Sequence, residues 1–301
     1  MAHFLVTGGT GFIGSVLIRN LSEAGHHATV LTRQPNKYTG QIGGHIRYES
    51  SFNAIDDNEV FQAVINLGGE GIGDKLWSEK RKQVLLDSRI ELTKQLVACL
   101  KRLNTRPEVM ISGSAIGWYG AQDENPLAED AKYHAEFTHD LCQQWEEAAS
   151  EVKTLGVRLC IIRLGLVLGS NGGVLKRLLP PFKFGLGGRI GSGKQIMSWV
   201  HINDVIQALN FLVNNNELEG VFNLTAPAAA SNAEFTRHLA SALSRPAFFP
   251  LPSVVVKLLF REMGDRLLLQ GQNVVPNRLL EAEYGFEYPA LEDALEQILH
   301  S

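Results

Sequence analysis

Short apolar runs alternate along the chain with longer stretches in which apolar residues recur every three or four positions. The runs predict strands near residues 3–7, 27–32, 45–48, 63–67, 108–113, 157–162 and 221–224. The stretches predict helices near 12–24, 79–103, 134–155, from about 203, 232–243, 253–260 and 291–299. This alternation is typical of an α/β fold with a doubly wound parallel sheet.

The two longest helical stretches carry clear core-facing stripes. Ser78 can cap the first, and the leucines that follow it form a broad apolar face. The second repeats Phe137, Leu141 and Trp145 at four-residue spacing. We expect these side chains to pack in the core and not against a cofactor.

A glycine-rich turn follows the first predicted strand. Residues 3–7 lead directly into Gly8-Gly9-Thr10-Gly11-Phe12-Ile13-Gly14, which opens the first helix. A dinucleotide pyrophosphate needs this geometry, because the glycines let the backbone approach the phosphates and the helix N-terminus offers free N–H groups. The sequence therefore predicts a Rossmann fold that binds a dinucleotide, with a purely structural tight turn as the alternative.

The end of the second predicted strand indicates which nicotinamide cofactor binds. An acidic residue there would hold the ribose 2′-hydroxyl of NAD, but this chain has Arg33. No Asp or Glu occurs from Ala24 to Tyr48, so a 2′-phosphate would meet positive charge. We therefore predict NADP, the alternative being that Arg33 is an ordinary solvated cation.

Composition limits the partners. With 301 residues and 45% apolar content, the chain can bury a substantial core. Its net charge of −4 argues against nucleic acid or an anionic membrane surface as the main partner. The three cysteines, Cys99, Cys142 and Cys160, are far apart and suggest neither a disulfide framework nor a metal site.

The ends and the lobes of the protein can also be predicted. A strand that begins after two residues leaves no room for a signal peptide, so we expect a cytoplasmic protein. We expect residues 1–165, completed by about 200–224, to form the NADP-binding Rossmann domain. Residues 166–199 and 225–301 would form a smaller substrate lobe, including a small C-terminal domain. Glycines and prolines are so frequent from 169 to 193 that we expect this region to be built from loops.

The chain resembles the extended short-chain dehydrogenase/reductases, which include nucleotide-sugar epimerases and dehydratases. The motifs that carry the resemblance are the glycine turn, Asn66-Leu67-Gly68-Gly69, Ser112-Gly113-Ser114-Ala115, Tyr119-Gly120, Arg163 and the segment Trp199 to Val205. More narrowly, Gly-Leu-Gly-Gly-Arg-Ile-Gly-Ser-Gly at 185–193 resembles an epimerase-like branch with a small C-terminal domain of unknown function.

This resemblance implies a set of cofactor contacts. Gly8, Gly11 and Gly14 would form the turn, and the segment Thr10, Gly11, Phe12, Ile13 would touch the pyrophosphate. Thr32 and Arg33 would lie at the adenosine end, and Asn66, Leu67 and Gly68 near the nicotinamide-side ribose. Arg89 falls where relatives have a cofactor-contacting Asn, and it either meets a phosphate or is an exposed helical cation.

The family's chemistry also implies a proton relay, from a Ser or Thr near the fifth strand and a Tyr with a Lys four residues later. None of the six tyrosines in this chain has that lysine. The helix that should carry the pair has Thr138 and Cys142 at the two positions. Without the lysine, a phenol with a reference pKa of about 10 is a poor base at neutral pH.

Substitutes for the missing relay can be named. Ser114 is the best catalytic serine and Ser112 the second, while Tyr119 and His139 are candidate proton donors. Each of these side chains could instead be structural. Cys142 could be a nucleophile, but its context favours a buried, inert thiol.

The glycine-rich loop supplies substrate-binding candidates by the same resemblance. Gly188, Arg189 and Lys194 would approach an anionic moiety, and His201 would line the site. The alternative is a flexible lid with exposed cations.

Two functions remain open at this stage. The first is an NADP-dependent, epimerase-like oxidoreductase that acts on a small, unidentified and possibly nucleotide-linked substrate with a modified relay. The second is a non-catalytic NADPH-binding sensor. A nucleic-acid-binding or structural module fits the charge balance poorly.

Overall fold

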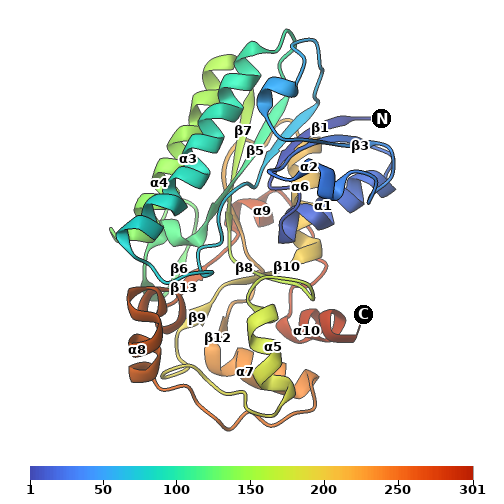
Figure 1. The fold of residues 1–301 in the computed structure, drawn as a ribbon. Helices are drawn as coiled ribbons and strands as arrows, with labels where there is room; N and C mark the ends of the chain where they lie inside the picture. The colour runs from blue at the N-terminus through green and yellow to red at the C-terminus, as the bar shows by residue number, and fades with distance from the viewer. Residues whose placement is uncertain (301) are drawn as a thin grey trace.

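The computed structural model describes residues 1–300, apart from the side chains at positions 123 and 124. Figure 1 shows a large lobe built on a central sheet and a smaller lobe below it. The central strands are β1 (His3–Thr7), β2 (His27–Leu31), β3 (Ile46–Glu49), β4 (Ala63–Asn66), β5 (Val109–Ala115), β7 (Arg158–Leu164) and β11 (Gly220–Leu224). The main helices are α1 (Phe12–Glu23), α2 (Pro35–Tyr38), α3 (Glu79–Arg102), α4 (Phe137–Ser150), α5 (Leu175–Lys183), α6 (Ile202–Asn214), α7 (Asn232–Ala242), α8 (Ser253–Gly264), α9 (Asn277–Glu281) and α10 (Leu291–His300).

Shorter elements complete the chain. The short strands are β6 (Gln122–Leu127), β8 (Leu166–Leu168), β9 (Ile196–Met197), β10 (Trp199–His201), β12 (Ala230–Ser231) and β13 (Gln272–Val274). The single helical turns are η1 (Phe52–Ala54), η2 (Ile116–Tyr119), η3 (Glu151–Leu155) and η4 (Asp265–Leu269).

The central sheet has seven strands in the order β11-β7-β5-β4-β1-β2-β3, and every neighbouring pair is parallel. This confirms the predicted doubly wound Rossmann sheet. The order reverses between β1 and β4, and ligands of such sheets bind in the crevice at the carboxyl ends of the strands beside that reversal.

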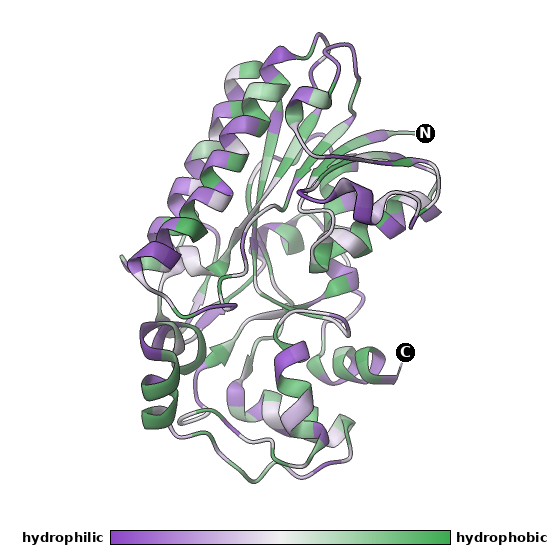
Figure 2. Ribbon diagram, in the orientation of Figure 1, coloured by the Kyte–Doolittle hydropathy of each residue, from purple (hydrophilic) through white to green (hydrophobic). Residues whose placement is uncertain are grey.

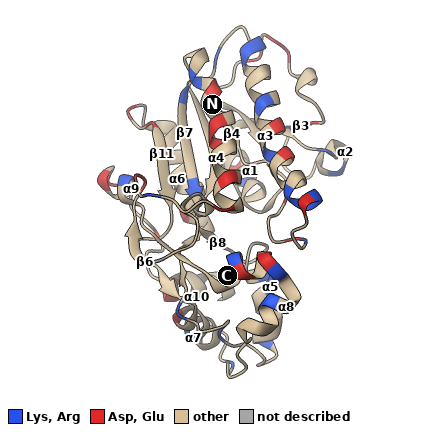
Figure 3. Ribbon diagram, turned by 90° about the vertical axis from the view of Figure 1, so that its left-hand side faces the viewer, with Lys and Arg blue, Asp and Glu red and all other residues tan. Residues whose placement is uncertain are grey.

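Helices cover both faces of the sheet. Figure 1 shows α3 and α4 on one face and α1 and α6 on the other. Along β1, Phe4 and Val6 pack on the side of α1 and α6, whereas Leu5 between them packs on the side of α3. Figure 2 shows the apolar colour running through the sheet, and Figure 3 shows charged residues spread along α3 and α4.

The region between β7 and β10 was predicted as loops, and this was wrong for α5. The glycines gather before and after Leu175–Lys183, so a nine-residue helix fits between them. Its buried Leu175 and Phe182 anchor it in the core of the small lobe. This packing outweighs the lost backbone donors of Pro180 and Pro181, which lie inside the helix.

Two parallel strand pairs connect distant parts of the chain where no strand was predicted. β6 pairs with β13, and β8 pairs with β10. The β6 sequence is polar and contains Pro126, so it lacks the period-two apolar pattern of a strand. Through these pairs, the segments after β5, β7 and α8 meet below the carboxyl edge of the central sheet (Figure 1).

The turn between β1 and α1 is closely packed. Gly8 has a φ of +71°, which favours glycine, and a side chain there would also meet the carbonyl of Leu67. A Cβ on Gly14 would lie 2.2 Å from the carbonyl oxygen of Gly8. Helix α1 can therefore approach the turn only because position 14 has no side chain.

We expect Gly14→Ala to destabilise the protein. Overpacking against backbone costs about 1–3 kcal/mol, which exceeds the roughly 1 kcal/mol that alanine gains over glycine in a helix. Chemical denaturation of this variant and of Ser15→Ala, an exposed position next to it, measures the difference. A Gly14→Ala protein as stable as the control would contradict the packing described for this turn.

Candidate functional site: a nucleotide groove and an adjoining cavity

A groove of about 1,100 Å³ lies at the carboxyl edge of the sheet, at the predicted crevice. Its wall includes seven of the residues predicted to contact the cofactor: Gly8, Thr10, Gly11, Thr32, Arg33, Leu67 and Gly68. They come from the loops that follow β1, β2 and β4. The structure thus brings together residues from three separate parts of the sequence.

The N-terminus of α1 opens onto this groove. Gly11 is the N-cap residue, no described side chain caps this end, and the first turn has no acidic residue. The backbone N–H groups of the first turn are therefore available to an anion. A 12-residue helix adds the positive end of its dipole at the same place.

Other predicted cofactor residues lie outside the described groove wall. The ring of Phe12 packs against Gly169, Gly172 and Gly173 of the small lobe, as the close approach of those glycines to it shows. Ile13 packs on the core between the sheet and α1.

Asn66 has a structural position at the end of β4. It is buried, accepts a hydrogen bond from Thr7 at 2.7 Å, and donates to Thr93 at 2.9 Å and to Ser112 at 3.0 Å. These bonds tie β1, β4, α3 and β5 together beneath the groove.

Arg33 lies at the rim of the groove with a 91% exposed side chain, and it pairs with Glu70 at 3.1 Å. Glu70 lies far along the chain from the second strand, whose surroundings predict NADP, so the sequence did not reveal this carboxylate. Hydrogen bonding from Arg81, followed by Arg33, holds the pKa of Glu70 below its usual value. An exposed ion pair of this kind contributes at most about 1 kcal/mol, so Arg33 can readily turn to another anion.

Arg89 lines a second cavity, and its guanidinium lies against Gly69 of the groove wall. Its guanidinium donates to the carbonyl of Leu85 at 3.0 Å and to that of Glu70 at 2.9 Å. The side chain is half-buried and stands 5.2 Å from the ring centre of Trp145. Arg89 is therefore not the exposed helical cation that was one alternative.

The second cavity, of about 270 Å³, lies between the carboxyl edge of the sheet and the small lobe. Its surface is mostly apolar. The lining comes from the end of β5 and η2, from α4, from α5, from β9 and from η4. Apolar members include Ile72, Ile116, Leu141, Leu166, Val174, Leu178, Ile196, Met197, Leu267 and Leu268.

Thr138 and Cys142, which the family resemblance predicts at the Tyr and Lys positions, both line this cavity. Thr138 and Cys142 are one turn apart on α4. The Thr138 hydroxyl donates to Glu136, and the Cys142 thiol contacts the carbonyl of Ala115 at 3.6 Å. Burial raises the pKa of the Cys142 thiol to about 11, so the group is a neutral thiol at physiological pH.

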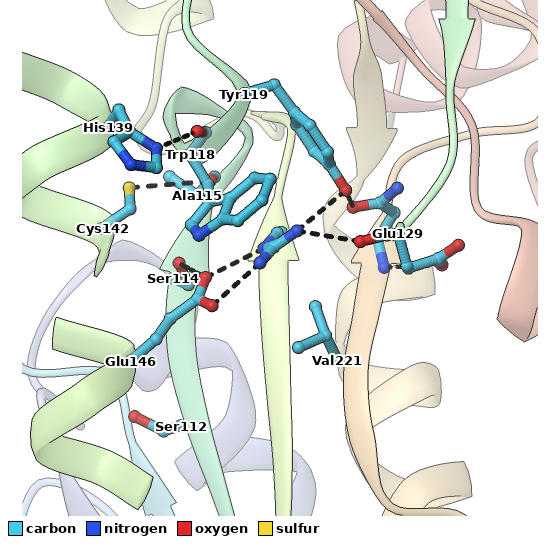
Figure 4. Close-up of polar contacts among 12 residues, drawn as sticks. Ser112, Ser114, Ala115, Trp118, Tyr119, Glu129, His139, Cys142, Glu146 and Val221 are labelled. Carbon is cyan, nitrogen blue, oxygen red and sulfur yellow. Dashed lines mark hydrogen bonds and ion pairs between the residues drawn. The ribbon is translucent and has the colours of Figure 1, made fainter. Parts of the chain in front are cut away.

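Ser114 and Tyr119 take part in a buried polar network behind the cavity. Figure 4 shows Glu146 of α4 next to Ser114 of β5, whose hydroxyl donates a hydrogen bond to it. Arg163 donates to the two carboxylate oxygens of Glu146 at 2.9 and 3.0 Å. The Tyr119 hydroxyl accepts from Arg163 and donates to Asn223 of β11. Burial is the largest influence on the Tyr119 phenol and raises its pKa, against the opposing effect of Arg163.

Ser112 and His139 are also buried away from the described cavity wall. The Ser112 hydroxyl accepts from Asn66. His139 bonds through Nδ1 to the carbonyl of Trp118, and its ring stacks on Tyr133 at 3.7 Å. None of the four predicted catalytic side chains therefore belongs to the cavity lining described above.

The loop predicted to bind substrate has only Ile190 on the cavity wall. Ile190 forms an isolated parallel bridge with Leu251, and the backbone turns at the next residue, Gly191, which has a φ of +57°. Arg189 lines a separate groove with Arg237 and Arg245.

The three other substrate-binding candidates are also absent from the described cavity lining. Gly188 packs closely on the backbone of Phe249, and Lys194 is exposed. His201 is buried where α6 begins.

No group of three or more His, Cys, Asp or Glu side chains is placed to hold a metal ion among residues 1–300. None of the helices described above is both long and apolar enough to cross a membrane.

The chain is similar to known proteins over its whole length. The model of the NAD dependent epimerase/dehydratase family matches residues 4–225, and a domain of unknown function matches residues 251–298. An epimerase family protein of Staphylococcus saprophyticus is 36% identical over 303 residues, which cover 100% of both chains. An epimerase family protein of Staphylococcus aureus is 35% identical over 300 residues, which cover 99% of both chains.

Solved structures are similar as well. The human epimerase family protein SDR39U1, solved with NADPH, is 34% identical with a TM-score of 0.89, over 99% of both chains. A UDP-glucuronic acid 4-epimerase of Bacillus cereus, solved with a fluorinated UDP-sugar and NAD, has a TM-score of 0.80 over 99% of this chain and 98% of its own. At 18% identity, the second likeness shows the fold alone.

We expect Glu146→Gln to destabilise the protein by about 3–5 kcal/mol, because it leaves the charge of Arg163 buried without its partner. Glu147→Gln, the next residue on the same helix, is exposed and should change stability by less than about 0.5 kcal/mol. Urea unfolding of both variants measures this. Equal stabilities would mean that the buried pair contributes little.

A second prediction concerns pH. The neutral His201 ring accepts from the backbone N–H of Asn203 at 3.1 Å and donates to Gln297 at 2.9 Å. Burial lowers the pKa of His201. In the unfolded chain His201 therefore binds a proton near the reference pKa of about 6.5, whereas in the folded protein it binds that proton only at a lower pH. The free energy of unfolding should consequently fall as the pH drops from about 7.5 to about 5.

The variant His201→Asn removes this titration but keeps a side-chain acceptor for the helix N-terminus. Its stability should depend less steeply on pH than that of the unchanged protein. His300→Asn, at the exposed end of α10, is the control. Parallel pH profiles for all three proteins would contradict the role assigned to His201.

Proposed function

The chain belongs to the NAD dependent epimerase/dehydratase family, and from this premise we propose that it is an NADP-dependent, epimerase-like oxidoreductase. In this proposal it transfers a hydride to or from a small-molecule substrate, with a proton relay that differs from the usual Tyr–Lys pair. The observation that carries the proposal is the open nucleotide groove, bounded by the N-terminus of α1 and Arg33, with a separate small cavity next to it.

The residues of the groove fit a nicotinamide dinucleotide. The first turn of α1 would hold the pyrophosphate, and Thr32 and Arg33 would hold the adenosine end. Leu67 and Gly68 would lie along the nicotinamide-side ribose, with Arg89 of the cavity wall next to Gly69 of the groove wall. When bound, the nicotinamide supplies or accepts the hydride.

Two observations support NADP over NAD. Arg33 is exposed at the rim, and the pairing of an Arg with a phosphate is strong and can be bidentate. The human relative at 34% identity was solved with NADPH. Glu70 opposes this choice, but Arg33 and Arg81 both neutralise its charge.

In this proposal the proton follows a different route from the one in family members that use the Tyr–Lys pair. Thr138 and Cys142 provide a hydroxyl and a thiol on the cavity wall, where substrate or an ordered water could reach them. Ser114 and Tyr119 would act as positioning residues, because their hydroxyls are bonded to Glu146, Arg163 and Asn223.

A second candidate function is a sensor that binds NADPH without turnover. The missing Tyr–Lys pair and the high pKa of the Cys142 thiol favour it, since neither leaves a group that titrates near neutral pH at these positions. Both functions require cofactor binding and differ in catalysis. Incubating the protein with NADPH and a panel of aldehydes and ketones, while following nicotinamide absorbance, distinguishes them: oxidation of NADPH supports the enzyme, and its absence across the panel supports the sensor.

The cofactor assignment predicts a selective effect of Arg33→Ala. This variant should lose about 1–3 kcal/mol of NADPH affinity, the contribution of a hydrogen bond to a charged group, and little NADH affinity. Lys37→Ala, a nearby cation outside the described groove lining, should leave both affinities unchanged. Calorimetric titration measures all four affinities, and an equal loss for NADPH and NADH in Arg33→Ala would refute the assignment.

A further inference from the structure

We infer that the cavity accepts a small, neutral, mostly apolar carbonyl compound or alcohol, and that it excludes the nucleotide part of a nucleotide sugar. The inference rests on the proposed oxidoreductase function and names the substrate class of the same site. It differs from a nucleotide-linked or anionic substrate, which the sequence pattern of residues 185–193 had suggested.

Size is the first reason. The cavity measures about 270 Å³, whereas pockets for drug-sized ligands measure roughly 300–1,000 Å³. A nucleotide sugar is larger than such ligands. The neighbouring groove of about 1,100 Å³ is large enough, but the proposed cofactor uses it.

Charge is the second reason. The described lining contains three charged side chains: Arg89, Glu136 and Arg266. Arg266 and Glu136 pair with each other at 3.0 Å. Arg89 donates to two backbone carbonyls, and its guanidinium lies against Gly69 of the groove wall. The cavity interior therefore has no cation available for a carboxylate or phosphate on the substrate.

The cations that could bind such a group lie elsewhere. Ile190 lines this cavity, whereas Arg189, the residue before it, lines the other groove. Lys194 also lies outside the described lining. The small lobe thus contributes mostly apolar side chains to this cavity, while its arginines at 189, 237 and 245 line the separate groove.

The polar groups of the wall are suited to a neutral ligand. Most bond within the protein: Asn232 accepts from the backbone of Ile190, and Ser198 bonds to the backbone of residues 272 and 274. The indole N–H of Trp145 and Oε1 of Gln195 have no partner, but both atoms are inaccessible to solvent, so neither reaches a ligand without a side-chain movement. The wall therefore leaves few polar groups for a ligand, which suits a molecule with one carbonyl or hydroxyl group on an apolar body.

In the direction of reduction, the reaction balances with the cofactor alone. The substrate carbonyl carbon would take the hydride from NADPH, and the electron pair of the carbonyl π bond would move to the oxygen. That oxygen would then take one proton from solvent or from a side chain of the cavity wall. The products are the alcohol and NADP⁺.

The experiment compares matched ligands on the protein saturated with NADPH. Hexanal, cyclohexanone and benzaldehyde are the neutral probes, and 4-carboxybenzaldehyde and UDP-glucose are the charged ones. Thermal shift and calorimetry measure binding, and nicotinamide absorbance measures turnover separately. We expect at least one neutral probe to bind, and to bind about tenfold or more tightly than either charged probe, because an unpaired charge is costly to bury.

A variant tests whether the neutral probe binds in this cavity. Leu178→Phe fills part of the cavity from α5 and should weaken binding of the neutral probe about tenfold, with NADPH affinity unchanged because Leu178 is not on the described groove wall. Leu186→Phe, on the exposed loop that follows α5, is the matched control and should change neither.

The outcomes separate the two proposals. Binding of a neutral probe without turnover would support the cavity assignment while removing the oxidoreductase function. Turnover of UDP-glucose, or tighter binding of either charged probe than of any neutral one, would overturn the inference and leave the oxidoreductase standing. Failure of every neutral probe to bind would overturn it as well.

Discussion

The buried ion pair between Arg163 and Glu146 holds the site in shape. It joins α4 to β7, and through Ser114 and Tyr119 it extends to β5 and to the segment that follows β5. Asn223 connects the same network to β11. Because two charges taken out of water must satisfy each other, α4 cannot shift along the sheet without leaving one of them unpaired. The positions of Thr138 and Cys142 on the cavity wall follow from this anchoring.

The groove follows the family pattern more closely than the cavity does. The groove keeps the glycine turn and the free N-terminus of α1, and it extends across the ends of three strands. On the cavity wall, a threonine and a neutral thiol occupy the two positions expected for a proton relay. A protein can retain cofactor binding while its chemistry changes, because the groove and the cavity use largely different residues.

The sequence predicted the fold well because the signals were local. Periodic apolar residues specified the seven central strands to within one or two residues. The predictions that failed depended on tertiary contacts. The helix α5 forms despite two prolines because Leu175 and Phe182 find a core, and β6 forms because β13, about 150 residues later, pairs with it.

The site was predicted only in part for the same reason. The motif around Gly8 to Gly14 has its own spacing signal, whereas Glu70 reaches Arg33 from 37 residues away and carries none. Ser114 and Tyr119 were named because polar residues near the fifth strand belong to the family's chemistry, but their hydrogen-bond partners come from α4, β7 and β11. Arg189 lines a different groove from its neighbour Ile190, and no residue type in that loop reveals this.

Calorimetric titration of the unmodified protein with NADPH, and in parallel with NADH, measures whether the groove binds NADP. We expect one NADPH bound per chain, with an affinity about tenfold or more above that for NADH, because the 2′-phosphate adds a charged hydrogen bond to Arg33. No heat of binding for either dinucleotide, or tighter binding of NADH, would contradict it.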